Sequence, residues 1–144
     1  MTRDEFLSTM TSFRATIAPG GTARDIELMA AGLQRMRAAI APAWLRDFYA
    51  VCGGVILGNA VIFGPKEIEN GLQHPVPTVI QVNDEIANME SMRGMTVWGR
   101  NDLFWFALDT MGTCYMLDNT TLRKLRKYDD PYRAMGECMA VGRL

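Results

Sequence analysis

The chain has 144 residues and a mass of 16.1 kDa, a size that fits one domain with a single hydrophobic core. Apolar residues make up 49% of it and charged residues 22%, which excludes an intrinsically disordered or collagen-like chain. The net charge of −1 excludes the overall basicity on which non-specific nucleic-acid binding depends. We therefore predict one globular domain over residues 1–144 with no nucleic-acid partner.

The cysteines and the first residues bear on the compartment of the protein. Cys52, Cys114 and Cys138 are an odd number at wide spacing, which does not fit a zinc knuckle or a redox pair. Residues 3–5 are all charged, where a secretion signal would need an apolar core. We expect reduced, mostly buried thiols in a cytoplasmic protein.

One uncharged stretch, residues 48–65, approaches the length of a membrane-spanning helix. Four glycines and Pro65 interrupt it, and this pattern is typical of a helix end followed by short strands. We therefore reject a transmembrane segment and expect no membrane partner.

Two amphipathic helices are predicted at the start of the chain. Thr2 and Glu5 have the spacing of a capping box, and apolar residues at steps of three or four continue from there to Ile17. Thr22 is expected to cap a second helix, whose apolar stripe extends as far as Ile40.

A third helix and a hairpin are predicted next. Pro42 suits the first turn of the helix, and Gly53 and Gly54 are expected to cap its end. Two short β-branched runs at residues 55–57 and 61–63, separated by a Gly-Asn pair, predict a β-hairpin.

The middle of the chain has weaker patterns. We predict one helical turn at residues 65–70, a surface connection at 73–77 and a strand at 78–82. Asn83 is then expected to cap a short helix that extends to Met92 and carries acidic residues near its positive end.

The strongest pattern in the chain is a three-stranded antiparallel meander. Aromatic and β-branched runs at residues 96–99, 103–108 and 113–117 are joined by short turns. A fourth strand is predicted near residues 123–128, ahead of a last helix that begins at Pro131. Helices at both ends with strands between them predict an α+β domain.

Residues that could carry out catalysis are scarce. The single histidine, His74, has no second His or Cys at metal-ligand spacing, so we predict no metal site and no cofactor. Gly53 and Gly54 follow a helix instead of preceding one, which does not fit a phosphate-binding loop. No serine lies in a strained glycine elbow.

Three aspartates, Asp102, Asp109 and Asp118, are placed at strand ends around the meander. Together they could supply an acid, a base and a metal anchor. Turn chemistry explains them better, because an Asp at the first position of a turn caps the backbone. We therefore predict that the chain is not an enzyme.

The order of these parts resembles the SUKH superfamily, which includes fungal cell-wall regulators and bacterial immunity proteins. The resemblance extends over most of residues 22–140. It rests on Trp44, Leu45, Phe48, Tyr49, Gly53-Gly54, Val61-Ile62-Phe63-Gly64, Trp98-Gly99, Asn101-Asp102, Phe104 to Leu108, Asp109, Gly112, Tyr115 and Leu117-Asp118. These are packing, capping and turn positions, which bear on fold more than on function.

The resemblance implies a SUKH-like α+β fold with N-terminal helices, a central antiparallel-rich sheet and a C-terminal helix. It also implies a binding function, since many bacterial members neutralise a toxin, often a nuclease, that neighbouring cells deliver. We expect an immunity protein that occludes a cognate toxin. The acidic side chains that we expect to meet a basic toxin cleft are Glu67, Glu69, Asp84, Glu85 and Glu90.

Two alternatives stay open at this point. The first is a regulatory interaction module with an endogenous partner, which would use Trp98, Trp105 or Tyr115 if the sheet leaves one face open. The second and weaker one is an enzyme that works with carboxylates alone.

Overall fold

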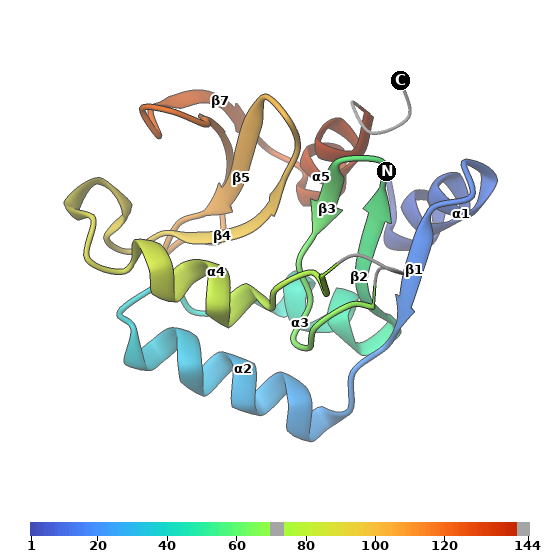
Figure 1. The fold of residues 1–144 in the computed structure, drawn as a ribbon, viewed down its shortest axis with the longest axis horizontal. Coiled ribbons are helices and arrows are strands. Elements are labelled where there is room, and N and C mark those ends of the chain that lie inside the picture. Colours follow the sequence, from blue (N-terminus) through green and yellow to red (C-terminus); the bar gives the residue numbers. More distant parts are fainter. Residues whose placement is uncertain (70–73, 141–144) are drawn as a thin grey trace.

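The computed structural model describes residues 1–69 and 74–140, and it is an α+β domain. Its helices, together with one 3-10 helix η1, surround a single antiparallel sheet (Figure 1). The helices are α1 (Arg3–Ser12), α2 (Ala23–Arg35), α3 (Ala43–Val51), α4 (Val79–Ile86), η1 (Glu90–Met92) and α5 (Pro131–Ala140). The strands are β1 (Thr16–Pro19), β2 (Cys52–Leu57), β3 (Ala60–Ile62), β4 (Thr96–Arg100), β5 (Phe104–Leu108), β6 (Cys114–Asp118) and β7 (Lys124–Tyr128).

The sheet has the simplest possible topology, because each strand pairs with the next one along the chain. Its order is β1-β2-β3-β4-β5-β6-β7, and every pair is antiparallel. The predicted hairpin is β2 and β3, and the predicted meander is β4, β5 and β6 with β7 as its fourth strand. These predictions are confirmed. They could be made because alternating apolar residues in runs joined by short turns specify pairing between neighbouring strands.

The helices pack on the sheet and on one another in layers. Helix α5 packs across β3 to β7, while α1 lies against α5. Helix α3 contacts β2, and helix α4 contacts β4. Helix α2, at the lower edge of Figure 1, packs on both α3 and α4. The centre of the core holds large aromatic side chains that are almost fully buried, Trp98, Phe106, Phe48, Tyr49 and Phe6.

The predicted first helix ends earlier than expected. Arg14 adopts a left-handed conformation with φ of 59°, and the amide of Ala15 donates to the Met10 carbonyl at 3.1 Å. This geometry closes α1, so Ile17 lies in β1, where it pairs with Val55 of β2. The prediction of a helix through Ile17 is wrong, because pairing at the edge of the sheet overrides the apolar spacing.

The second helix also ends before its predicted limit. Helix α2 stops at Arg35, and Ile40, which we placed on its buried stripe, is 66% exposed in the connection to α3. At its other end the predicted cap is confirmed, because Thr22 and Asp25 form a capping box.

The predicted strand at residues 78–82 is wrong, because these residues begin helix α4. The Thr78 hydroxyl accepts from the Gln81 amide, and the Gln81 side chain accepts from the Thr78 amide, which makes a capping box. Asn83, the predicted cap, lies inside α4 and is buried. The β-branched residues at 78–82 favoured a strand, but the capping box at Thr78 stabilises the start of a helix instead.

Two further expectations for the glycine-rich region are corrected. Gly53 and Gly54 lie within β2, because α3 ends at Val51 and the chain continues directly into the strand. The predicted helical turn at residues 65–70 is also wrong over its described part, since Ile68 forms a β-bridge with Val76. Asn70 and Gln73 lie outside the described residues.

Candidate functional site

The five acidic residues predicted to bind a partner are all exposed. Glu67 and Glu69 follow β3, Asp84 and Glu85 are on α4, and Glu90 is on η1. The fold places Glu67 against α4, because its carboxylate accepts from Gln81 of that helix at 3.3 Å. Over residues 1–69 and 74–140, none of the five carboxylates forms an ion pair.

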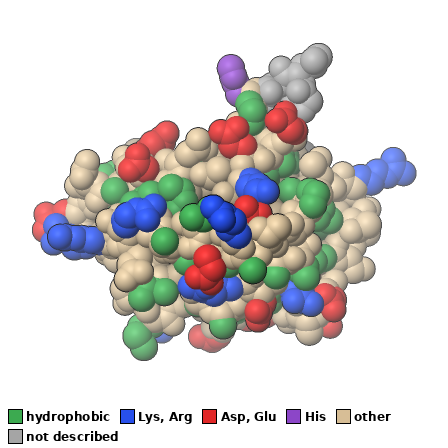
Figure 2. Space-filling model, turned by 90° about the horizontal axis from the view of Figure 1, so that it is seen from below, with side chains coloured by type: hydrophobic (Ala, Val, Ile, Leu, Met, Phe, Trp, Pro, Cys, Tyr) green, Lys and Arg blue, Asp and Glu red, His purple; other side chains and the backbone are tan. Residues whose placement is uncertain are grey.

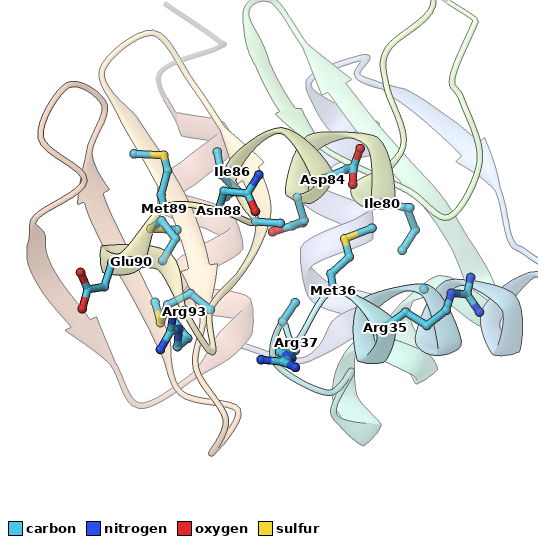
Figure 3. A pocket seen from close by; sticks show the side chains of 16 residues that line it. Arg35, Met36, Arg37, Ile80, Asp84, Ile86, Asn88, Met89, Glu90 and Arg93 are labelled. Carbon is cyan, nitrogen blue, oxygen red and sulfur yellow. The ribbon is translucent and has the colours of Figure 1, made fainter.

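A groove of about 610 Å³ lies between the end of α2 and the α4–η1 segment (Figure 3). Asp84 and Glu90 line it, whereas Glu67, Glu69 and Glu85 do not. Its other lining residues include methionines and isoleucines from both sides, among them Met36, Met89, Met92, Ile80 and Ile86. Two of the predicted acidic residues are thus part of a concave surface that we did not predict.

Helices α2 and α4 pack closely at the groove. A Cβ atom on Gly32 of α2 would lie 2.7 Å from the Cδ1 atom of Ile80, so the absence of a side chain lets the two helices approach. Helix α4 is held in turn by the buried Asn83, whose side-chain amide bonds the backbone of Val97 in β4. The α4 wall of the groove is therefore attached directly to the sheet.

The end of α2 forms the opposite wall. Arg37 has φ of 59°, and the Ala38 amide donates to the Leu33 carbonyl at 3.0 Å, as in a Schellman motif. Glycine is the usual residue at this left-handed position, and a side chain there costs about 1 kcal/mol. The chain instead places an arginine at the rim of the groove.

Three arginines, Arg35, Arg37 and Arg93, line this groove, and all are exposed. Among the described residues, none of them forms an ion pair with a carboxylate. Nothing in the sequence indicated that they share a site. Arg35 and Arg37 lie off the apolar stripe of the predicted second helix, and Arg93 directly follows the short helix that was predicted to extend to Met92. Figure 2 shows acidic, basic and apolar side chains interspersed on the face seen from below.

Two of the three strand-end aspartates cap the backbone of their turns, and Asp102 does not. The Asp109 carboxylate accepts from the Met111 and Thr113 amides, and Asp118 accepts from two amides of its own turn. These bonds confirm the prediction for Asp109 and Asp118. At the β4–β5 turn, Asn101 caps the backbone instead, and the Asp102 carboxylate accepts from an asparagine of the β2–β3 turn.

These aspartates do not form a cluster. Asp102 and Asp118 are at one end of β5, and Asp109 is at the other end. The length of the strand places Asp109 roughly 20 Å from Asp102. No group of three metal-ligating side chains is found among the residues that the structure describes.

The thiols and the histidine are not arranged as reactive groups. Burial raises the pKa of Cys52 to about 11 and that of Cys114 to about 12, and it raises the pKa of Cys138 as well. A raised pKa keeps these thiols protonated and unreactive at neutral pH. His74 is exposed and follows the undescribed residues 70–73.

The aromatic side chains of the sheet are largely occupied within the fold. Trp98 is completely buried and packs edge to face on Trp44, so it cannot contact a partner. The Tyr115 hydroxyl donates to Asp109 at 3.2 Å, and the Lys124 ammonium lies 4.4 Å from the centre of its ring. Trp105 is half-buried.

Within residues 1–69 and 74–140, no helix has both the length and the apolar character needed to cross a bilayer. The comparisons with known proteins give no assignment for the chain. No protein-family model matches it, and no curated protein is similar in sequence.

Proposed function

We propose that this chain is a binding protein of the SUKH type that does no chemistry itself and serves as an immunity protein. In this proposal it neutralises a cognate bacterial toxin by covering the active or substrate-binding surface of that toxin. The observation that supports it best is the set of five exposed carboxylates, none of which forms an ion pair within the described residues, and two of which, Asp84 and Glu90, line an open groove. Negative charge and a concave surface therefore occur together at Asp84 and Glu90.

The position of the carboxylates supports the choice of a basic partner. Asp84 and Glu85 project from α4, and Glu90 follows on η1. Glu67 is held against the same helix by the Gln81 side chain. Exposed carboxylates that are not neutralised by an ion pair attract a basic surface and speed its encounter. A toxin that binds nucleic acid, such as a nuclease, presents a basic surface of this kind.

The alternative is a regulatory module with an endogenous partner. Such a module would need an aromatic face of the sheet, but Trp98 is buried, and Tyr115 and Trp105 are only half-exposed, the first with its hydroxyl bonded to Asp109. Immunity is therefore the function that the geometry supports best.

The experiment measures survival of bacteria that express the toxin encoded beside the gene for this protein. We expect the wild-type protein to restore growth. A variant with all five acidic residues replaced by lysine should fail to restore it while retaining its thermal unfolding transition. Rescue by that variant would remove the proposed surface, and a toxin-free genomic neighbourhood would favour the regulatory module.

A matched pair of double variants separates local charge from total charge. Asp84→Lys with Glu85→Lys changes two acids on α4, and Asp47→Lys with Asp129→Lys changes two exposed acids elsewhere. Both variants shift the net charge equally. Only the first should weaken protection, and equal loss in both would contradict the assignment of the surface.

A further inference from the structure

The groove between α2 and α4–η1 has two different walls. The end of α2 carries the guanidinium groups of Arg35 and Arg37, and the α4–η1 segment carries the carboxylates of Asp84 and Glu90 together with Arg93, which follows η1 (Figure 3). All five groups are exposed, and none of them forms an ion pair within the described part of the chain. The groove is therefore open to solvent, with separated charges of both signs along it.

The floor between these walls is apolar and adaptable. Met36 and Ile80 face one another across the packing of α2 on α4, and Met89 remains 43% exposed at the η1 end. Methionine is unbranched and polarisable, so a surface lined by it fits side chains of several shapes. Such a floor suits an apolar side chain better than a fully hydrated ion.

Two features of the groove argue against a polyanion such as nucleic acid. Its phosphates would pair with the arginines, but they would also meet the carboxylates of Asp84 and Glu90. They would in addition leave the apolar floor uncovered. A protein segment that carries an apolar side chain and charges of both signs satisfies all three parts of the surface.

The left-handed arginine at the rim is not by itself evidence for binding. Arg14 adopts the same φ of 59° at the end of α1, and it does not line this groove. Arg37 differs because its side chain belongs to the wall of a concave surface together with two further arginines. Arg14 therefore serves as a matched control for the conformation without the site.

We infer that this groove binds a segment of the partner protein in which an apolar side chain is flanked by acidic and basic side chains. The apolar side chain would pack on the methionine floor, the acidic side chains would pair with Arg35, Arg37 and Arg93, and the basic ones would pair with Asp84 and Glu90. Guanidinium groups bind carboxylates with strong, charge-assisted hydrogen bonds. The inference deepens the proposed function, on which it rests for the identity of the partner as a toxin.

The test uses no toxin, so its result does not depend on the proposed function. A phage library of random twelve-residue peptides is selected on the immobilised protein, and the affinity of the enriched peptides is measured by fluorescence anisotropy. We expect enriched peptides to share an apolar residue next to Asp or Glu. Enrichment of no peptide, or of peptides without acidic residues, would overturn the inference.

Variants then locate the peptide. Arg37→Gly and Arg93→Ala should each weaken binding about tenfold, the loss typical of one charge-assisted contact. Arg14→Gly should leave the affinity unchanged, since it removes the same left-handed arginine from α1. Met89→Gln should also weaken binding, whereas Met111→Gln, at a side chain 85% exposed on the β5–β6 turn, should not. Equal effects within either pair would overturn the inference.

A growth assay separates this inference from the proposed function. If the Arg37→Gly and Arg93→Ala variants protect cells from the toxin as well as the wild type, the groove is not the toxin site and the inference fails. The immunity function itself would then stand. If the wild type gives no protection but binds the acidic peptides, the proposed function fails while the groove remains a peptide site.

Discussion

Asn83 of α4 occupies the place of a missing strand beside Val97 of β4. Its side-chain amide donates to the Val97 carbonyl at 2.8 Å and accepts from the Val97 amide at 2.8 Å. Strand β3 pairs with β4 only through Val61 and Ile62, so the backbone of Val97 lies beyond the end of this ladder. The asparagine thereby satisfies a buried peptide group and attaches a wall of the groove to the sheet.

Removal of this amide should be costly. Asn83→Ala leaves the amide and carbonyl of Val97 buried without partners, and we expect a loss of about 2 to 4 kcal/mol in the free energy of unfolding. Urea denaturation measures it. Asn88→Ala, at an exposed position just beyond α4, is the matched control and should change stability by less than about 0.5 kcal/mol. Similar losses in the two variants would contradict the role assigned to Asn83.

Substitution by alanine should change stability in opposite directions at Gly64 and Gly136. A Cβ atom on Gly64 would lie 1.7 Å from the carbonyl oxygen of Gly53, which is backbone and cannot move aside cheaply. Gly64→Ala should therefore destabilise the protein by more than about 2 kcal/mol. A Cβ atom on Gly136 in α5 meets nothing within 4 Å, so Gly136→Ala should stabilise the protein by about 0.5 to 1 kcal/mol. Thermal unfolding of both variants tests the pair.

The predictable parts of the fold were those that depend on local patterns. The meander of β4 to β6 follows from alternating apolar residues and short turns, and the starts of α1 and α2 follow from their capping boxes. The start of α4 was not predicted although Thr78 and Gln81 form the same capping box, because β-branched residues dominate that segment and favour a strand. Strand β1 was not predicted because its pairing with β2 is a long-range contact that apolar spacing does not encode.

The candidate site could be predicted only in part. The acidic residues were visible as charges in the sequence, and they are exposed as expected. The groove was not visible, because it depends on the approach of α2 to α4 at Gly32 and Ile80, far apart in the chain. Arg35 and Arg37 lie at the end of α2 whereas Arg93 follows η1, and only the packing of these elements places the three around one groove.

The acid stability of the protein should depend in part on Asp25. Hydrogen bonds from the backbone of Thr22, and then the ammonium of Lys66 at 3.1 Å, hold the pKa of this carboxyl below its usual 3.8. Because the folded value is the lower one, the contribution to stability is present above about pH 4 and disappears as the pH falls through the folded value. The difference in unfolding free energy between wild type and Asp25→Asn should therefore be largest at neutral pH and shrink in acid. Lys66→Gln should reproduce only part of it, and a difference that grows in acid would contradict this assignment.

The three thiols should resist modification while the protein is folded. Cys52, Cys114 and Cys138 are all buried, and burial raises the pKa of each of them, so little thiolate is present at neutral pH. With Ellman's reagent we expect no reaction in buffer beyond the slow rate of unfolding, and complete reaction of all three in denaturant. Met111→Cys supplies the control, because residue 111 is 85% exposed and its thiol should react at once. Rapid labelling of any native thiol in the wild type would show that the core around it opens far more readily than its packing implies.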